Sequence, residues 1–187
     1  MELSYKNLLN GLLIAGVMSM LPLPTHAQSS PPTTPLKIEG MRRSQRTLSN
    51  ALNTRVLQFA ESKRGQQVGR GECWDLADEA LNSAGAHRPN QAGYGAYVFG
   101  QAVALTALKA GDILQFENVN FKHTSPNGSW SSNSFPHHTA VVRSVQGRQI
   151  ELLQQNVKND RHVQTGTINL DDRQAGGTIT AYRPQGR

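Results

Sequence analysis

The stretch that decides the fold surrounds the single cysteine of the 187-residue chain and reads Gly71-Glu72-Cys73-Trp74-Asp75-Leu76-Ala77. Apolar residues recur from here at helical spacing, which predicts a helix from about residue 73 to 84 that stops at Gly85. Its polar residues, Asp75 and Asp78 among them, are expected to face outward. The buried stripe is expected to hold Cys73, Leu76, Ala77, Ala80, Leu81 and Ala84.

The position of Cys73 in the first helical turn has two interpretations. Unpaired backbone N–H groups and the positive end of the helix dipole favour the thiolate over the thiol, which suits a nucleophile. Free cysteines are also common as small buried apolar residues with a structural role only. Position alone leaves both interpretations open.

The N-terminal segment predicts export. A short polar start with Lys6, an apolar run over residues 8–21 and the small-residue site before Gln28 indicate a signal peptide over residues 1–27. A retained anchor is the alternative, although the run is short for a bilayer span. We therefore expect a secreted or periplasmic protein with no transmembrane segment in the mature chain.

The rest of the chain suits one domain. Residues 28–45 are rich in Pro, Ser and Thr at their start and predict a linker, and residues 46–187 predict the folded unit. The net charge of +6 and a pI near 9.8 favour an anionic cell wall or membrane surface as partner. The alternative is a solvated positive face that keeps the protein soluble. Nucleic acid is not expected as a partner, because the sequence has no motif that combines aromatic and basic residues.

Helices come first and strands follow, which predicts an α+β fold. A first helix is expected from Ser49, as N-cap, to about Gly65, with Leu48, Leu52, Val56, Phe59 and Ala60 on one face. A turn at Gly111-Asp112 leads into a strand that ends near Phe116. A long polar loop over residues 123–136 is expected to overhang a cleft. Further strands are expected at 138–145, 148–157, 162–170 and 177–183.

The register of the hairpin over residues 138–157 decides which groups meet His138. A three-residue loop at Val145-Gln146-Gly147 places Gln154 opposite His138 and Asn156 two residues further along the same face. A two-residue loop instead places Gln155 opposite His138 and brings Glu151 onto the face with Val142, which is a poorer apolar surface. We therefore expect the three-residue loop, with His138, Ala140, Val142, Ile150, Leu152 and Gln154 on one face.

A thiol at a helix start, a histidine at a strand start and an amide on the next strand are the parts of a cysteine nucleophile system. Their order resembles the papain-like superfamily in its circularly rearranged branch, that of the NlpC-type and CHAP amidases and endopeptidases. The stretch around Cys73 is closer still to a cysteine-proteinase-fold domain attached to some fungal actin-patch SH3 adaptor proteins. The residues that carry the resemblance are Cys73-Trp74, the segment 108–116, His138-Thr139-Ala140-Val141-Val142 and Gln154-Gln155-Asn156.

The resemblance implies roles for these residues. Cys73 is then the nucleophile and His138 the base, with Gln154, or Asn156 beside it, as the third group. CHAP members usually carry a glutamate at the position of Gln154, and a neutral amide orients an imidazole but does not stabilise its positive form as a carboxylate would. Gln67 is a candidate donor to an oxyanion hole. His137 is adjacent to His138 and is expected to point to the opposite face, so no metal site is expected.

The function implied is a secreted cysteine amidase or peptidase that acts without a cofactor on a peptide or cell-wall polymer. The same scaffold also suits a transferase or deamidase. The alternative is a non-catalytic binding module on the same fold, attached to an anionic surface or a partner protein, which the replacement of glutamate by Gln154 favours. An effector or inhibitor that targets another cell's proteins is a third possibility that the sequence does not distinguish.

Overall fold

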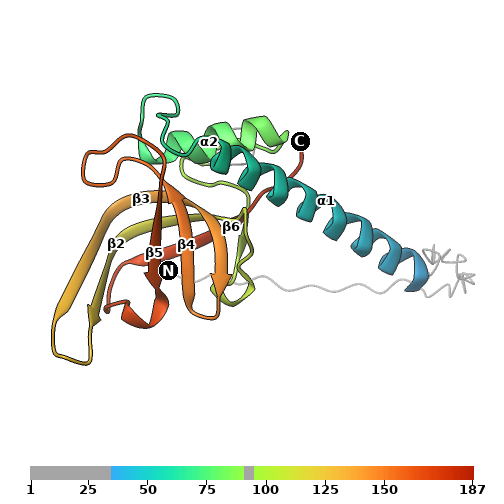
Figure 1. Ribbon diagram of the computed structural model, residues 1–187. Helices are drawn as coiled ribbons and strands as arrows, with labels where there is room; N and C mark the ends of the chain where they lie inside the picture. The colour runs from blue at the N-terminus through green and yellow to red at the C-terminus, as the bar shows by residue number, and fades with distance from the viewer. Residues whose placement is uncertain (1–34, 91–94) are drawn as a thin grey trace, which may run out of the picture. The chain divides into compact units, whose positions relative to one another are not determined.

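The structure of the chain is a computed structural model that describes residues 35–90 and 95–187 (Figure 1). Two helices come first and a six-stranded antiparallel sheet follows, which confirms the predicted α+β class. The elements in chain order are α1 (Pro35–Ser62), α2 (Cys73–Ala84), β1 (Gln101–Val103), η1 (Leu105–Ala107), β2 (Ile113–Thr124), β3 (Trp130–Gln146), β4 (Gln149–Gln154), β5 (Gln164–Asn169), η2 (Leu170–Asp172) and β6 (Thr178–Arg183).

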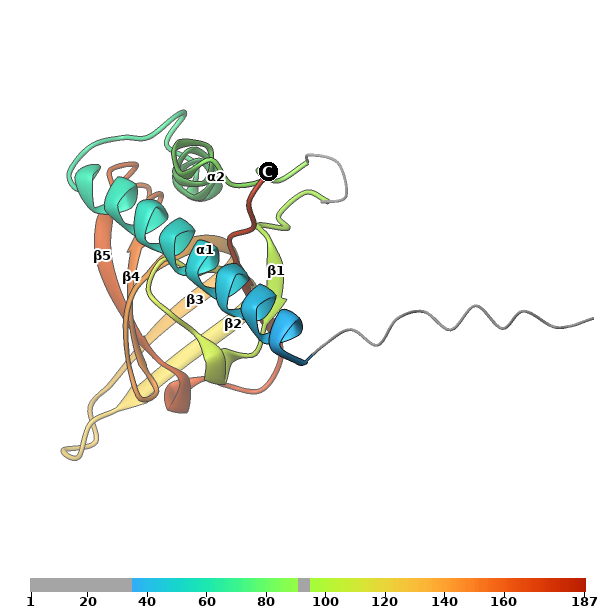
Figure 2. The same ribbon diagram turned by 90° about the vertical axis from the view of Figure 1, so that its right-hand side faces the viewer.

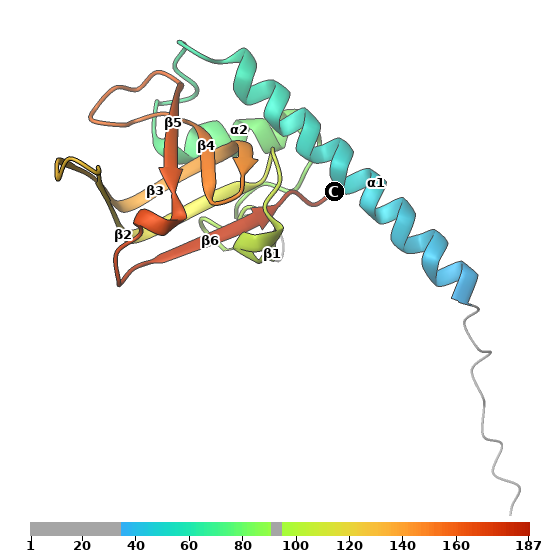
Figure 3. The ribbon, with the colours of Figure 1, turned by 60° about the horizontal axis from the view of Figure 1, so that its bottom comes forward.

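The sheet has the order β1-β6-β2-β3-β4-β5. Long strands β2 and β3 form its centre, and both helices pack on the same side of it (Figures 1 and 2). The view from below shows the strands curving beneath the helices and η2 joining β5 to β6 (Figure 3). The sheet therefore has a helix side and a far side.

Each side of the sheet has its own apolar cluster. The helix-side cluster joins residues of α1 and α2 to Ile113, Val141 and Leu153 of the strands. The far-side cluster contains Phe116 and Ala140 together with residues of η1 and η2, and no residue of either α-helix. Because successive strand residues point to opposite faces, neighbours in sequence such as Ala140 and Val141 belong to different clusters.

Asp112 fixes the helix layer to the sheet. Its carboxylate is fully buried, accepts from Asn53 Nδ2 of α1 at 2.8 Å and pairs with Arg183 of β6 at 2.8 Å. Gly111 before it has a φ of +82°, and a Cβ there would lie 2.1 Å from the Asn53 carbonyl oxygen. The predicted turn at Gly111-Asp112 is thus confirmed, and glycine is required by both conformation and space.

Helix α1 differs from the prediction at its start. It begins at Pro35, so Ser49 lies within the helix and residues 35–45, predicted as part of a linker, are helical. Leu52, Val56 and Ala60 are buried as expected, whereas the Leu48 side chain is exposed. The first half of α1 makes no contribution to either described apolar cluster, so no hydrophobic periodicity marks its start. The domain boundary at residue 46 stays a prediction.

The predicted polar loop over residues 123–136 is wrong, because β2 and β3 continue as a hairpin through most of it. Thr124 pairs with Trp130, and Val119 pairs with Phe135 further down the ladder. Phe121 and Phe135 pack edge to face, with their ring centroids 6.0 Å apart. Only the tip, residues 125–129, is a turn. Ser- and Asn-rich sequence concealed the strand, since polar side chains are compatible with an exposed ladder.

The predicted register of the β3–β4 hairpin is also wrong. Gln146 pairs with Gln149 across a two-residue turn, and the pairing shifts at Arg143 so that Val142 faces Leu152. The irregularity restores the apolar face that a simple two-residue loop would have disturbed, because Ala140, Val142, Ile150 and Leu152 still share the far-side cluster.

The described residues include no helix that is both long and apolar enough to cross a membrane. The predicted signal peptide, residues 1–27, lies outside the described residues.

Candidate functional site

Cys73 is the first residue of α2 and follows the N-cap residue Glu72. Glu72 and Asp75 form a reciprocal capping box, and Asp75 Oδ2 also accepts from the backbone N–H of Arg70 at 2.7 Å. Asp75 is therefore buried, contrary to the prediction that it faces outward, because its carboxylate satisfies the N–H groups of the approaching loop. Asp78 is also buried and pairs with Arg88.

Gln155 holds the loop that leads into α2. The side chain is fully buried; its Oε1 accepts from Val68 N–H at 3.1 Å and its Nε2 donates to the carbonyls of Val68 at 3.0 Å and Glu72 at 2.7 Å. Sequence reasoning gave this residue no role. The sequence feature that could have indicated this role is the position of Gln155 next to Gln154, because alternation of side chains along a strand places Gln155 on the helix side.

Asn156 does not join His138. Its Nδ2 donates to Glu72 Oε2 at 2.9 Å, so it supports the capping box at the start of α2. Of the two predicted candidates for the third group of the site, the structure therefore brings only Gln154 to the histidine.

The sulfur of Cys73 lies in surroundings that favour the neutral thiol. Burial raises the pKa of Cys73 above its usual 9.0, and the nearby Glu72 carboxylate adds to the rise. The backbone N–H groups of Thr139 and Trp74 act in the opposite direction but do not outweigh burial. The helix start alone was expected to favour the thiolate, and burial overrides it.

The Thr139 hydroxyl is also a hydrogen-bond partner of the sulfur. Its single hydrogen is donated to Gln115 Oε1 at 2.6 Å, and Gln115 is held in that orientation by donating to Glu117 Oε1 at 2.9 Å. The contact of this hydroxyl with the sulfur, like those of the backbone N–H groups, lowers the pKa of Cys73, and burial outweighs it.

The polar chain continues on the helix side to His137. The Glu117 carboxylate contacts His137 Nδ1 at 2.8 Å, and this hydrogen bond lowers the pKa of Glu117. The His137 ring packs edge-on to Tyr97, with centroids 4.4 Å apart, and Tyr97 in turn contacts Trp74. We call this set the helix-side chain; its members are Cys73, Thr139, Gln115, Glu117 and His137.

His138 lies on the far side of the sheet. It pairs across strands with Phe116, stacks on Phe135 with centroids 5.1 Å apart, and is buried. Burial lowers the pKa of His138 below its usual 6.5, against the opposing effect of the hydrogen bond to Gln154. The imidazole is therefore neutral near pH 7.

Gln154 orients this imidazole as the sequence predicted, through Oε1 at 2.9 Å from His138 Nε2. The two residues are diagonal neighbours: continuing the observed register by one residue places Gln154 opposite Ala140. Gly166 on β5 makes room for the amide, since a Cβ there would lie 2.1 Å from Gln154 Nε2. The contact exists although the predicted register does not.

The structure does not bring the predicted pair together. Cys73 contacts Thr139 on the helix side. His138 and Gln154 line a pocket of about 300 Å³ on the far side, and Cys73 is not among the described residues that line it. Within the described residues no hydrogen bond joins Cys73 to a histidine. Gln67, the predicted oxyanion donor, is exposed and donates to the carbonyl of Gly69 in its own loop.

The fold and this cysteine-centred helix start define a protein of the cysteine-proteinase-fold class. Residues 26–187 match the family model of the AIM3/BBC1 cysteine proteinase-fold domain, and the chain belongs to this family. The predicted resemblance is thereby confirmed.

One curated relative is "Altered inheritance of mitochondria protein 3" of Debaryomyces hansenii, 34% identical over 151 residues. The match covers 72% of this chain and 16% of the relative, so the chain spans about a sixth of that protein's length. Among solved structures, the crystal structures of Ly7917, alone and with the hydrolyzing product of MDP, have TM-scores of 0.46 and 0.47. In each case the identity is 16%, and the match covers 71% of this chain and 62% of the solved chain.

The predicted secreted or periplasmic location is wrong. The relative is named for the inheritance of mitochondria, which is a process inside the cell. The location was inferred from the N-terminal apolar run alone, which is why the family relationship overturns it.

Proposed function

We propose that this domain is a non-catalytic, protein-binding module built on the cysteine-proteinase fold. The observation that carries the proposal is the separation of thiol and imidazole: Cys73 contacts Thr139 on the helix side, and His138 is held by Gln154 on the far side. A cysteine nucleophile needs a base within hydrogen-bond reach, or a lowered pKa, and Cys73 has neither among the described residues.

Two further points support the proposal. Gln154 replaces the glutamate that CHAP members usually carry, and its neutral amide stabilises an imidazolium less than a carboxylate would, so burial keeps the pKa of His138 low. The family relationship favours a protein partner, because the resemblance is to a domain attached to SH3 adaptor proteins and because the matched relative is a much longer chain. Cys73 of α2 and His138 of β3 then have structural roles on opposite sides of the sheet.

The test is the pH dependence of iodoacetamide labelling at Cys73, followed by mass spectrometry. We expect slow labelling that rises only toward pH 9 and is unchanged in His138→Ala and in His137→Ala. Both histidine variants are needed because His137, not His138, shares the side of the sheet with Cys73. Rapid labelling below pH 7 that either variant abolishes would contradict a non-catalytic role.

A thiol hydrolase is the second candidate, favoured by one observation. The His138–Gln154 hydrogen bond orients the imidazole as in a cysteine nucleophile system, with Nε2 as the donor and Nδ1 unprotonated. Activity would require the ring to reach Cys73 around Thr139. Labelling that depends on His138, and not on His137, would favour this candidate.

A further inference from the structure

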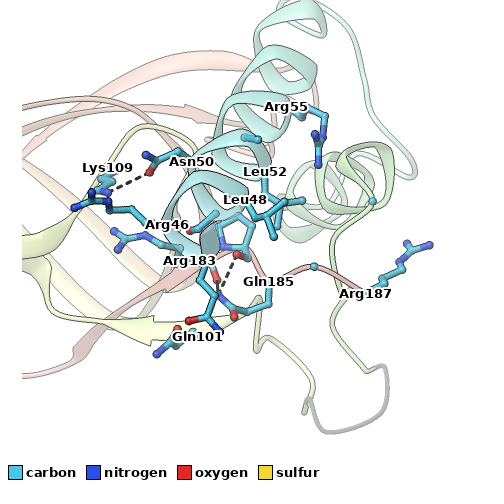
Figure 4. Close-up of a pocket in the computed structure, with 16 residues that line it drawn as sticks. Arg46, Leu48, Asn50, Leu52, Arg55, Gln101, Lys109, Arg183, Gln185 and Arg187 are labelled. Carbon is cyan, nitrogen blue, oxygen red and sulfur yellow. Dashed lines mark hydrogen bonds between the residues drawn. The ribbon is translucent and has the colours of Figure 1, made fainter. Parts of the chain in front are cut away.

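Helix α1 and the C-terminal segment enclose a groove of about 840 Å³ that is distant in sequence from Cys73 (Figure 4). One wall is the stretch of α1 from Gln45 to Arg55, and the other is formed by Gln101, Lys109 and residues 183–187. Leu52 lies at its floor and is buried, whereas Leu48 at its edge is 63% exposed. Leu48 therefore gives the groove an apolar edge that is open to water.

The groove is strongly cationic. Its described lining contains Arg46, Arg55, Lys109, Arg183 and Arg187 and no aspartate or glutamate. Figure 4 shows these side chains distributed along the groove, with Lys109 and Arg46 at one end and Arg187 at the other. The positive field therefore covers the whole groove.

Most of this charge has no internal counterion among the described residues. Arg183 pairs with buried Asp112. By contrast, Arg55 donates to the Ala84 carbonyl, and Lys109 Nζ contacts the neutral Asn50 side chain at 3.3 Å. Arg187 likewise contacts only neutral groups, the carbonyl of Ala86 and the side chain of Asn82. The groove thus holds cations whose charge an incoming ligand would neutralise.

We propose that this groove binds an acidic segment of a partner protein, with an apolar side chain of that segment packed on Leu48. The inference rests on the proposed binding function and adds the chemistry of the partner. Carboxylates of the segment would meet Arg46, Lys109 and Arg187 along the groove. A peptide fits this concave site better than a bilayer does, because the cations lie on the walls of a groove instead of on one flat face.

Nucleic acid fits less well for a second reason. The described lining contains no Trp, Tyr, Phe or His on which a base could stack. The apolar element is an aliphatic side chain, which suits the leucine- or isoleucine-type anchor of a peptide.

The experiment is selection from a random-peptide display library on the immobilised full chain, with anionic phosphatidylserine vesicles as a second probe. We expect enriched peptides that are acidic and contain an aliphatic residue. The affinity of these peptides should fall about tenfold in Arg46→Glu, because the substitution replaces an attractive charge by one that repels the peptide carboxylates. Leu48→Ser should lower the affinity for the same peptides without changing the dependence of that affinity on salt concentration.

The matched control is Arg43→Glu, which makes the same charge change on an exposed turn of α1 outside the groove. It should leave affinity within about twofold of the wild type. Circular dichroism and thermal melting of each variant check that all fold.

Three outcomes would overturn the proposal: enrichment of neutral or basic peptides, equal losses in Arg43→Glu and Arg46→Glu, or no enrichment at all. Vesicle binding that depends on Arg46 in the absence of acidic peptides would also overturn it and assign the groove to a membrane. None of these results alters the labelling of Cys73, so failure of the groove leaves the test of the non-catalytic role intact.

Discussion

The two sides of strand β3 differ sharply at two adjacent residues. Thr139 faces the helices, fully buried, and links Cys73 to a chain of polar groups that ends at His137. His138, one residue earlier, faces the far side and lies among phenylalanines with Gln154. Residues that are neighbours in sequence thus lie in separate environments, because successive side chains of a strand point to opposite faces of the sheet.

The helix side of the sheet fixes the start of α2. Gln155 and Asn156 reach it from the end of β4, and both bond to Glu72. The far side fixes an imidazole instead, with space supplied by Gly166. A substitution on one side is therefore expected to leave the other side unchanged.

The largest effect is expected from Asp112→Ala, which removes the buried polar link between α1 and the sheet. The change leaves Arg183 without its buried partner and removes one of the two acceptors of Asn53 Nδ2, so the free energy of unfolding should fall by about 3–5 kcal/mol. Urea denaturation measures it. Asp171→Ala is the control, because its pair with Arg148 is exposed and should contribute less than about 1 kcal/mol.

Next in size is the difference between Gln155→Ala and Gln154→Ala, adjacent residues on opposite sides. Gln155→Ala leaves buried groups of Val68 and Glu72 unpaired and should cost about 2–4 kcal/mol in unfolding free energy. It should also speed alkylation of Cys73, since the loop before α2 is released. Gln154→Ala should leave the alkylation rate unchanged; equal rates in the two variants would mean that the sides are not independent.

Gly166→Ala should have a moderate effect confined to the far side. The new Cβ would clash with Gln154 Nε2, break its contact with His138 and destabilise the fold by about 1–3 kcal/mol. Thermal unfolding together with the imidazole NMR signals of His138 measures both. Gly40→Ala, on an exposed turn of α1 with open space around it, should be neutral or slightly stabilising.

The smallest effect concerns pH. Because burial lowers the pKa of folded His138, the unfolded chain binds a proton first as the pH falls below about 6.5. The stability contributed by the neutral imidazole is complete above that pH and is lost as the pH falls toward the folded pKa, by at most about 1.4 kcal/mol per pH unit. Urea unfolding at pH 7.5 and pH 5 should show a smaller loss in His138→Gln than in the wild type.

Much of this architecture was predictable from local patterns. The helix from Cys73 to Gly85, the turn at Gly111-Asp112 and the far-side face of the hairpin all follow from periodicity and turn chemistry. His138 and Gln154 also meet as predicted. These features depend on residues close together in sequence or on one ladder.

The rest depended on tertiary contacts. The ladder between β2 and β3 extends through a serine-rich segment because Phe121 and Phe135 pack together, which no local pattern reveals. The pKa of Cys73 is set by burial against Thr139 and the sheet, not by its helix position alone. The role of Gln155 follows from a loop distant in sequence that folds onto it.

Disulfide trapping tests the separation of the two sides most directly. Cysteine is placed at position 139 or 138, one at a time, in the chain that retains Cys73, and a mild oxidant is added. Thr139→Cys should form an internal disulfide rapidly, because residue 139 contacts the sulfur of Cys73, whereas His138→Cys should stay reduced. Rapid closure by His138→Cys, with Thr139→Cys slow, would place the histidine beside the thiol and contradict the account.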